Sequence, residues 1–549
     1  MRKAILTAFL AFATVCNCQA AKYKTPASVS VIPQPQEVLA AKGHFNARGA
    51  SVSVDPALGE FAQKRVAAFA TSLNTASGKE SALVKEGRIA FRKDATLQAE
   101  AYVITISPKK VDVAAADLNG CVYAIQTLKQ MLPEAIFAGE AAADADWTLP
   151  CVLIRDWPRF QYRGMHLDVV RHFFSKEEVL RYIDLLEMHK MNRLHWHLTD
   201  DQGWRIPVDA YPRLAEVSSQ RAQTVIGRNS GKYDGIPHGG CYTKAEIREI
   251  VAYAQERGIT IIPEVDMPGH MVAALAAYPE LGCTGGPYEV WQKWGISKDV
   301  LCLGKDATYD FLKAVFDEVC ELFPSEYIHI GGDECPKARW KECPDCQAKI
   351  AELGLKGDGK YSAEYYLQSY VTKYIENYLA SKGRKVIGWD EILEGEISPN
   401  ATVMSWRGVK GGRAAVKLGH TVIMTPNSHF YFDYYQTKSP KEREPLGIGN
   451  FIPVEKVYGF EPFTEDMTEE QRSLILGCQA NMWTEYVATN EHLEHMVLPR
   501  MCALSEVQWC RPERKDYDRF LGNMSKMFRI LDRTAYSYAP YLKEDGTVK

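Results

Sequence analysis

The sequence lacks several features that mark common classes of protein. Its 65 Lys and Arg residues nearly balance 69 Asp and Glu, for a formal net charge of −4. It has no basic tail or block of the kind that binds nucleic acid, so we expect no nucleic-acid partner. It also lacks an uninterrupted apolar run of the about 20 residues that a membrane-spanning helix needs, so we expect no transmembrane segment.

Residues 1–20 have the pattern of a signal peptide. Two basic residues come first, residues 4–15 are apolar, and residues 18–20 offer a small-residue cleavage site. We therefore expect an exported protein that is periplasmic, secreted or lipid-anchored at the cell surface. A lipid anchor would use Cys16 or Cys18.

What is present is a long chain of ordinary globular composition, 46% hydrophobic and 24% charged. Its length predicts two or three domains. Residues 25–152 mix strand patterns, at 101–107 and 111–114, with a helical pattern at 118–132. This region contains no catalytic constellation, so we expect a small α/β supporting domain.

Strand and helix signals then alternate through residues 156–510, which is typical of parallel β/α architecture. Two helices begin with a capping box, at residues 175–178 and 243–246. The expected strands cover residues 164–170, 193–198, 260–265, 327–330, 385–388, 402–405, 421–424 and 474–479. Eight such strands predict a (β/α)8 TIM barrel with long loops.

A doubly wound open sheet is the alternative architecture. It is disfavoured because no glycine-rich dinucleotide turn follows the first strand. Residues 511–549 are expected to form a C-terminal helical extension packed on the barrel, with one amphipathic helix at residues 516–531.

Polar and aromatic residues follow every expected barrel strand. In strand order they are Asp168 and Arg171; Asp200 and Asp201; His270; Asp333 and Glu334; Trp389; Trp406; Tyr431 and Asp433; and Trp483 and Glu485. Because the active sites of TIM barrels lie at the C-terminal ends of the strands, these residues should meet in one place. Carboxylates, an arginine and several tryptophans suit a neutral, hydroxyl-rich ring, so the pattern predicts a carbohydrate site.

The paired carboxylates Asp333 and Glu334 indicate how such a sugar would be cleaved. Most glycosidases place two carboxyl groups on opposite sides of the scissile bond, about 5 Å or more apart. Neighbours in sequence cannot easily straddle a sugar in this way. One of them can act as general acid, while the nucleophile is a 2-acetamido group of the substrate itself, as in the substrate-assisted glycosidases.

Six strings in this order closely resemble glycoside hydrolase family 20, the β-N-acetylhexosaminidases. They are RGMHLDVVRHF, HWHLTDDQGWR, PEVDMPGH, HIGGDE, GWDE and NMWTE. The resemblance covers the barrel, and the preceding domain looks like the small N-terminal domain of that family. It implies an exo-acting, retaining enzyme that releases terminal β-linked GlcNAc or GalNAc from glycans, without a metal or organic cofactor.

The resemblance also implies roles for individual residues. Glu334 would be the general acid/base, Asp333 would orient the acetamido nitrogen, and Tyr431 would donate a hydrogen bond to the acetamido oxygen. The other expected substrate-site residues are Arg171, Asp433 and Glu485 at the sugar hydroxyls, Trp389, Trp406 and Trp483 as walls, and Asp200 and His270 behind Glu334.

Other functions remain open. A chitobiose-preferring or disaccharide-releasing (lacto-N-biosidase-like) enzyme of the same family could use loops 227–240 and 281–301, with Tyr288, Trp291 and Trp294, as a further subsite. A glycan-binding protein without catalysis is the alternative outside enzymes. The complete set of carboxylates and tryptophans argues against it.

His195 and His197 form an HxH pattern, which occurs in barrel metallohydrolases. We favour histidines that are buried and hydrogen-bonded inside the barrel, because no convincing set of further ligands follows.

Cysteines cluster after the catalytic strand. Cys343 and Cys346 have zinc-like spacing, but no fourth ligand is evident besides the nearby Cys335, and an oxidising compartment favours disulfides. Cys283 and Cys302 flank an aromatic loop that a disulfide between them would brace.

Overall fold

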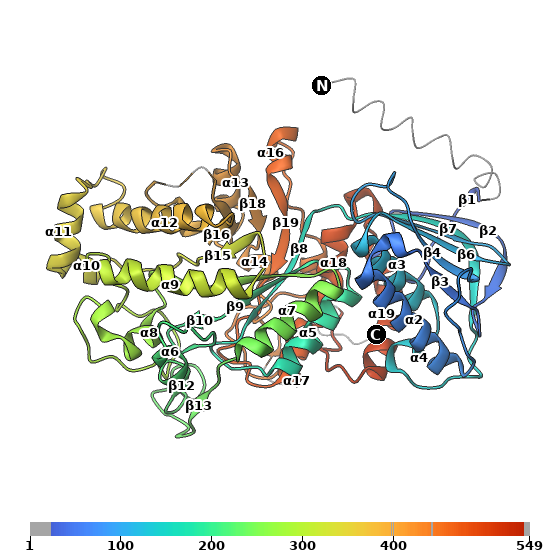
Figure 1. Ribbon diagram of the computed structural model, residues 1–549, viewed down its shortest axis with the longest axis horizontal. Coiled ribbons are helices and arrows are strands. Elements are labelled where there is room, and N and C mark those ends of the chain that lie inside the picture. The colour runs from blue at the N-terminus through green and yellow to red at the C-terminus, as the bar shows by residue number, and fades with distance from the viewer. Residues whose placement is uncertain (1–22, 397, 399, 441–442, 543–549) are drawn as a thin grey trace.

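The computed structural model describes residues 23–396, 398, 400–440 and 443–542, and it places a β-sheet domain beside a closed barrel (Figure 1). The predicted signal peptide, with Cys16 and Cys18, lies outside the described residues. Among the described residues, no helix has both the length and the apolar character to cross a membrane.

The N-terminal domain is built on a seven-stranded sheet. Its strands, in spatial order, are β1 (Thr25–Pro26), β2 (Glu37–Asn46), β7 (Thr148–Asp156), β5 (Tyr102–Ile106), β6 (Val111–Ala115), β4 (Ile89–Lys93) and β3 (Val52–Val54). Helices α2 (Glu60–Ser77) and α3 (Leu118–Met131) pack on this sheet and also contact the barrel helices α5 (Lys176–Met188) and α7 (Lys244–Glu256). They therefore form the layer that joins the two domains.

The barrel confirms all eight predicted strands. They are β8 (Tyr162–Asp168), β9 (Arg193–His197), β14 (Thr260–Glu264), β15 (Tyr327–His329), β16 (Lys385–Trp389), β17 (Thr402–Ser405), β18 (Val422–Met424) and β19 (Ile475–Ala480). Each pairs in parallel with its neighbours, and β19 closes on β8. The closed parallel barrel excludes the open-sheet alternative.

Helices surround the barrel. The longer ones are α5 (Lys176–Met188), α7 (Lys244–Glu256), α9 (Asp306–Leu322), α12 (Ala363–Ser381), α13 (Lys410–Lys417), α17 (Asn490–Val497) and α18 (Arg500–Trp509). Both predicted capping boxes are present, with Ser175 and Thr243 as the N-caps of α5 and α7. In each box the N-cap side-chain oxygen accepts a hydrogen bond from the backbone N–H of the third helical residue, and this bond fixes where the helix begins.

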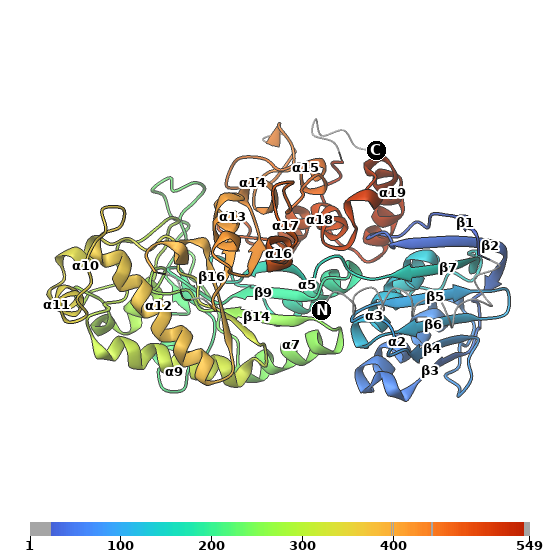
Figure 2. The ribbon, with the colours of Figure 1, turned by 90° about the horizontal axis from the view of Figure 1, so that it is seen from above.

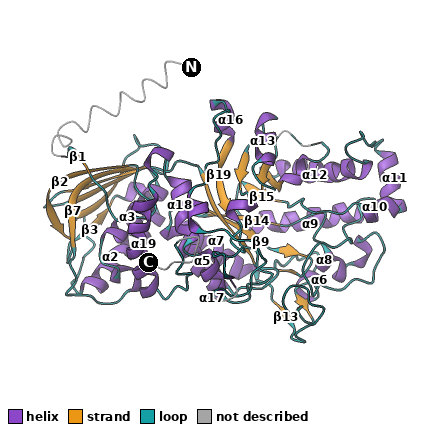
Figure 3. Cartoon of the chain, turned by 180° about the vertical axis from the view of Figure 1, so that it is seen from behind, coloured by secondary structure: helices purple, strands orange, loops and turns teal. Residues whose placement is uncertain are grey.

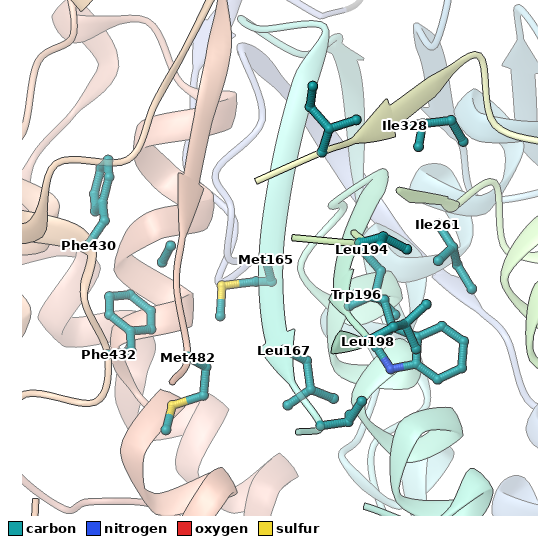
Figure 4. Close-up of a cluster of buried hydrophobic side chains, with 14 of the residues drawn as sticks. Met165, Leu167, Leu194, Trp196, Leu198, Ile261, Ile328, Phe430, Phe432 and Met482 are labelled. Carbon is teal, nitrogen blue, oxygen red and sulfur yellow. The ribbon is translucent and has the colours of Figure 1, made fainter. Parts of the chain in front are cut away.

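Strand alternation separates two kinds of side chain in the barrel. Met165 and Leu167 of β8 lie between Met482 on one side and Leu194 and Trp196 of β9 on the other (Figure 4). The intervening residues include buried histidines and acids, together with a separate apolar cluster that contains Ile262, Met404 and Ile423, so the barrel interior is mixed where its outer face is apolar. This division brings charged groups to the strand ends while the helices cover the hydrophobic face.

The last helix joins the two domains. α19 (Tyr517–Arg533) begins at the N-cap Asp516, as predicted, and its Phe520 ring lies 5.0 Å from that of Tyr458 in the barrel. Its other end contacts the N-terminal domain, where Lys526 Nζ donates to the Leu132 carbonyl at 3.0 Å. α19 therefore packs on the barrel and also reaches the first domain (Figures 2 and 3).

Some elements were not predicted. Strands β2 and β7 and helix α2 carry weak local signals but are central to the N-terminal domain. Residue 152, the predicted end of that domain, falls inside β7. Because β7 pairs with β2 and β5 up to Asp156, the sheet continues four residues further.

Candidate active site

A cavity of about 220 Å³ opens at the C-terminal ends of the barrel strands. It brings together ten of the eleven predicted site residues. The lining consists of Arg171, His270, Asp333, Glu334, Trp389, Trp406, Tyr431, Asp433, Tyr434, Ile448, Trp483 and Glu485. The remaining predicted residue, Asp200, is buried behind this lining.

A strained turn presents the two carboxylates. After β15, Gly331 and Gly332 have φ of 65° and 100°, and Glu334 has φ of 44°. A Cβ atom at Gly331 would lie 1.7 Å from Oδ1 of Asp266, the same oxygen that accepts the Gly332 N–H at 3.1 Å. Only glycine fits there, and a left-handed glutamate is a costly conformation that the surrounding contacts must hold.

His270 connects the carboxylates of the cavity with acids behind it. Its Nε2 lies 3.8 Å from Glu334 Oε2 and 3.9 Å from Asp333 Oδ2. Its Nδ1 lies 3.1 Å from Asp200 Oδ1 and 3.3 Å from Asp201 Oδ2. Burial by itself would lower the pKa of His270, but the Asp200 charge and these hydrogen bonds raise it well above its usual value.

Asp200 and Asp201 therefore both hold His270. Asp200 also bridges to Arg171, with 2.7 Å between its Oδ2 and the guanidinium, whereas Asp201 accepts the N–H of Val272 at 3.0 Å. Burial would raise the pKa of Asp200, but the charges of Arg171 and His270 hold it well below the usual range.

Arg171 is fixed in one orientation from several sides. Its guanidinium lies 3.1 Å from Asp168 Oδ2, its Nε donates to Gln202 Oε1 at 3.0 Å, and it lies over the Trp483 ring at 5.0 Å. Burial would lower the pKa of Arg171, but the Asp200 and Asp168 carboxylates raise it well above its usual value. A rigid charged fork of this kind suits oxygen atoms at fixed positions on a ligand.

Three acids of the cavity, Asp333, Asp433 and Glu485, resist ionisation. Burial, together with the Glu334 charge, raises the pKa of Asp333. Burial and the nearby Glu485 raise the pKa of Asp433, and burial likewise raises that of Glu485. Oδ1 of Asp333 and Oδ1 of Asp433 are buried, and no described residue hydrogen-bonds to either oxygen. Both oxygens can therefore accept hydrogen bonds from a ligand.

The aromatic walls are positioned by carboxylates outside the cavity. The Trp389 indole N–H donates to Glu264 Oε1 and the Trp406 indole N–H donates to Glu391 Oε2, both at 2.9 Å. The Trp406 ring is stacked with that of Tyr431 at 6.0 Å. Indole rings held in this way form flat apolar surfaces on which a sugar ring can lie.

Glu264 and the histidines around it were not predicted as part of the site. His195 Nε2 lies 2.9 Å from Glu264 Oε2, and His197 Nδ1 and His329 Nδ1 lie 2.5 Å and 3.0 Å from its carboxylate. Three histidines and a carboxylate could hold a metal, but His197 Nδ1 is hydrogen-bonded to the Glu264 carboxylate, which also accepts the Trp389 indole N–H, and His329 Nδ1 accepts the Gly331 N–H. The HxH pattern thus places two buried rings beneath the cavity, the arrangement that the sequence favoured.

Tyr434, Ile448 and Glu391 were also missed by sequence reasoning. Tyr434 lies one residue beyond Asp433 and Glu391 two residues beyond Trp389, so both stand at strand ends that the sequence already marked. Ile448 comes from a loop without a local signal.

Comparison with known proteins agrees with this geometry. Residues 160–512 match the glycosyl hydrolase family 20 catalytic domain, and residues 28–157 match domain 2 of the same family. A Porphyromonas gingivalis protein named beta-hexosaminidase is 43% identical over 443 residues, which are 80% of this chain and 55% of that protein. The chain thus spans about half the length of this relative.

Solved structures are also similar. A Vibrio harveyi exo beta-N-acetylglucosaminidase in complex with N-acetylglucosamine is 30% identical, with a TM-score of 0.81 over 94% of this chain and 80% of that one. A Bacteroides fragilis beta-N-acetylhexosaminidase is 32% identical, with a TM-score of 0.78 over 94% of this chain and 99% of that one. By its domains, its motifs and the layout of its cavity, the chain belongs to glycoside hydrolase family 20.

Proposed function

We propose that this glycoside hydrolase is an exo-acting, retaining β-N-acetylhexosaminidase that releases terminal β-linked GlcNAc or GalNAc. The observation that carries the proposal is the presence of adjacent Asp333 and Glu334 on one turn, in a small cavity walled by Trp389, Trp406 and Trp483. Two neighbours on one turn cannot straddle a sugar, so Glu334 can act as the general acid while Asp333 is not placed as the nucleophile. The relatives' names support the same activity.

The reaction proceeds in two steps. The acetamido oxygen of the substrate attacks C1 as the glycosidic C–O bond breaks, which forms a cyclic oxazolinium ion, and Glu334 gives its proton to the leaving oxygen. Water then attacks C1 of the oxazolinium ion, and Glu334 takes the proton from that water. Two inversions at C1 leave the configuration retained.

Glu334 is well placed for both proton transfers. About a third of its side chain is exposed, at 36%, so it can exchange protons with water, whereas Asp333 is only 14% exposed. The unpaired Oδ1 of Asp333 can accept the acetamido N–H. Tyr431, in the same cavity, can donate to the acetamido oxygen.

The end of the cavity explains exo cleavage. Arg171, Asp433 and Glu485 offer a charged fork and two carboxyl groups to the hydroxyls of a terminal sugar. Arg171 is held by Asp168 and Asp200, so its position is set before substrate binds. A chain extended at those hydroxyls would meet these side chains, and only a non-reducing end fits.

Turnover of aryl and disaccharide substrates tests the proposal. We expect Glu334→Gln to lose activity about 10²–10⁴-fold, the usual contribution of a general acid. The loss should be larger on chitobiose than on p-nitrophenyl β-GlcNAc, because p-nitrophenolate leaves without much protonation. Asp333→Asn should lower kcat on both.

A substrate comparison supplies the control. The wild-type enzyme should cleave p-nitrophenyl β-GlcNAc far faster than the 2-hydroxy glucoside, which cannot form the oxazolinium ion. Equal rates on the two substrates, or full activity of Glu334→Gln, would contradict the mechanism.

A disaccharide-releasing or chitobiose-preferring enzyme is the second candidate. Trp291 and Trp294 line a separate cavity of about 420 Å³, together with Tyr233, whereas Tyr288 is not among its lining residues. The Trp294 ring lies 6.3 Å from that of Tyr486, which follows Glu485 in the chain. A panel of substrates capped with GlcNAc, GalNAc or a disaccharide distinguishes the two candidate functions, because the exo-enzyme releases only monosaccharide.

We propose export for this chain on the strength of residues 1–20 alone. Fractionation of the producing cell, with the protein followed by antibody or activity, tests it. Recovery of the protein from the cytoplasm with residues 1–20 still attached would contradict the proposal.

A further inference from the structure

Four cysteines that are distant in sequence meet outside the cavity. Cys283 and Cys302 lie on the loop between α8 (Val272–Ala277) and α9, and Cys343 and Cys346 lie at the start of α11 (Pro344–Glu352). Their sulfur atoms all lie within 4.8 Å of one another. The fold thus adds Cys283 and Cys302 to the Cys343–Cys346 pair, whereas Cys335, which the sequence placed beside that pair, is not part of the group.

The sulfur–sulfur distances distinguish a metal site from disulfides. Cys302 Sγ lies 3.6 Å from both Cys343 Sγ and Cys346 Sγ, and Cys283 Sγ lies 3.9 Å from Cys346 Sγ. Tetrahedral zinc–thiolate bonds of about 2.3 Å imply sulfur–sulfur distances of about 3.8 Å. A disulfide requires about 2.05 Å. The cysteines in the described part of the chain are all free, so the predicted Cys283–Cys302 bridge is not formed.

The surroundings of the sulfurs favour a cation. Cys302, Cys343 and Cys346 are buried and Cys283 is half-buried. Four thiolates at this spacing would repel one another strongly unless a positive ion lay between them.

A glycine allows the loops to approach this closely. A Cβ atom at Gly304 would lie 2.1 Å from the carbonyl carbon of Asp345, the residue before Cys346. The loop that carries Cys302 is therefore pressed directly against the backbone of the Cys343–Cys346 segment. Such backbone contact brings ligands from two loops to one centre.

We propose that Cys283, Cys302, Cys343 and Cys346 bind one structural zinc ion in tetrahedral geometry. Four soft sulfur ligands in a closed tetrahedron are the donor set of structural zinc rather than of catalytic zinc, which keeps an open position. The site is separate from the sugar cavity, so a result that disproves the zinc ion would not disprove the proposed glycosidase activity.

The zinc ion would join two segments that lie next to the loops carrying His270 and Glu334. Cys302 follows Leu301, whose N–H donates to the Pro268 carbonyl at 3.1 Å, two residues before His270. Cys343 follows Glu334 by nine residues. The Trp340 indole N–H also donates to the Leu301 carbonyl, at 2.8 Å. A metal that joins these segments would hold His270 and Glu334 in a fixed position relative to one another.

Metal analysis of the whole chain tests the site. The protein, purified without added metal or reductant, should carry one zinc ion per chain by inductively coupled plasma mass spectrometry. Release by an organomercurial thiol reagent should be stoichiometric, and cobalt substitution should give the visible and near-ultraviolet absorption of tetrahedral cobalt thiolate.

Single variants locate the ligands. Cys283→Ser changes the half-buried member of the cluster, so the chain should fold but lose its zinc and melt at a lower temperature. Cys320→Ser, at a partly exposed cysteine on α9 outside the cluster, is the matched control and should keep the full zinc content.

Several outcomes would overturn the site. They are folded wild-type protein without stoichiometric metal even after exposure to zinc, unchanged zinc content in Cys283→Ser, and zinc loss in Cys320→Ser. A disulfide joining any two of the four cysteines, seen by peptide mapping under non-reducing conditions, would also overturn it.

Discussion

At the scale of single residues, the cavity contains polar atoms without partners and charges that compensate one another. Oδ1 of Asp333 and Oδ1 of Asp433 are buried without a partner among the described residues, a costly state unless a ligand supplies donors. Arg171 and His270, by contrast, are each paired with more than one acid. The paired groups set the shape of the site and the unpaired ones are left for substrate.

Glu391 gives a prediction about pH and stability. Burial and the charges of Asp333 and Asp390 raise its pKa to about 9. The folded protein therefore keeps a proton that the unfolded chain releases above about pH 4.5, and stability falls by roughly 1 kcal/mol per pH unit from there towards pH 9. Glu391→Gln removes this loss, so its melting temperature should exceed that of the wild type increasingly from pH 5 to pH 8.

Glu394→Gln is the control for this measurement. Glu394 pairs with Arg407, as Glu391 does, but its side chain is 25% exposed against 9% for Glu391. The melting difference between this variant and the wild type should stay flat over the same pH range. A flat difference for Glu391→Gln would contradict the buried, protonated state.

At the scale of elements, strand ends and the turns after them decide the site. Each barrel strand is short, with three to seven residues, and is followed by a loop at the same end of the barrel. The turn after β15 must reverse tightly, and it does so through Gly331 and Gly332 with positive φ. The position of both carboxylates depends on this turn.

Gly331→Ala tests the dependence of the carboxylates on that turn. The new Cβ would meet Asp266 at 1.7 Å, so the turn must shift, and we expect kcat/KM to fall at least tenfold. Gly359→Ala is the control, since Gly359 also has positive φ, 86°, but open space around it. Both should cost about 1 kcal/mol of stability through backbone strain. Equal activity of the two variants would show that the turn tolerates displacement.

At the scale of the whole molecule, the two domains are joined by a buried polar junction. Asp156, the last residue of β7, lies 3.1 Å from Lys190 Nζ of the barrel and accepts the indole N–H of Trp509 at 2.8 Å. The Tyr102 hydroxyl and the Gln36 N–H also donate to this carboxylate. Asp156 thus connects the N-terminal sheet with two barrel segments.

Asp156→Ala should weaken both domains together. Removing one partner of a buried ion pair costs about 3–5 kcal/mol, because Lys190 is left buried and unpaired. We expect one cooperative thermal transition at a lower temperature, measured by calorimetry. Asp144→Ala, at an exposed position in the same domain, should leave the transition unchanged. Separate transitions for the two domains in the wild type would contradict the coupling.

Much of the fold followed from local patterns. Periodicity identified all eight barrel strands and helices α3, α5, α7 and α19, because burial on one face imposes a repeat that can be read over a few residues. Strands β2 and β7 and helix α2 were not predicted, because pairing and packing with distant segments, rather than a local repeat, stabilise them.

The sequence by itself determined the family motifs, the strand-end residues and the adjacency of Asp333 and Glu334. The tertiary structure decided which residues lie behind them: Asp200 between Arg171 and His270, Glu264 under Trp389, and four cysteines from separate loops at one point. The physical reason is barrel closure. It brings the ends of eight distant strands together, and no pattern confined to one segment records which loop will meet which.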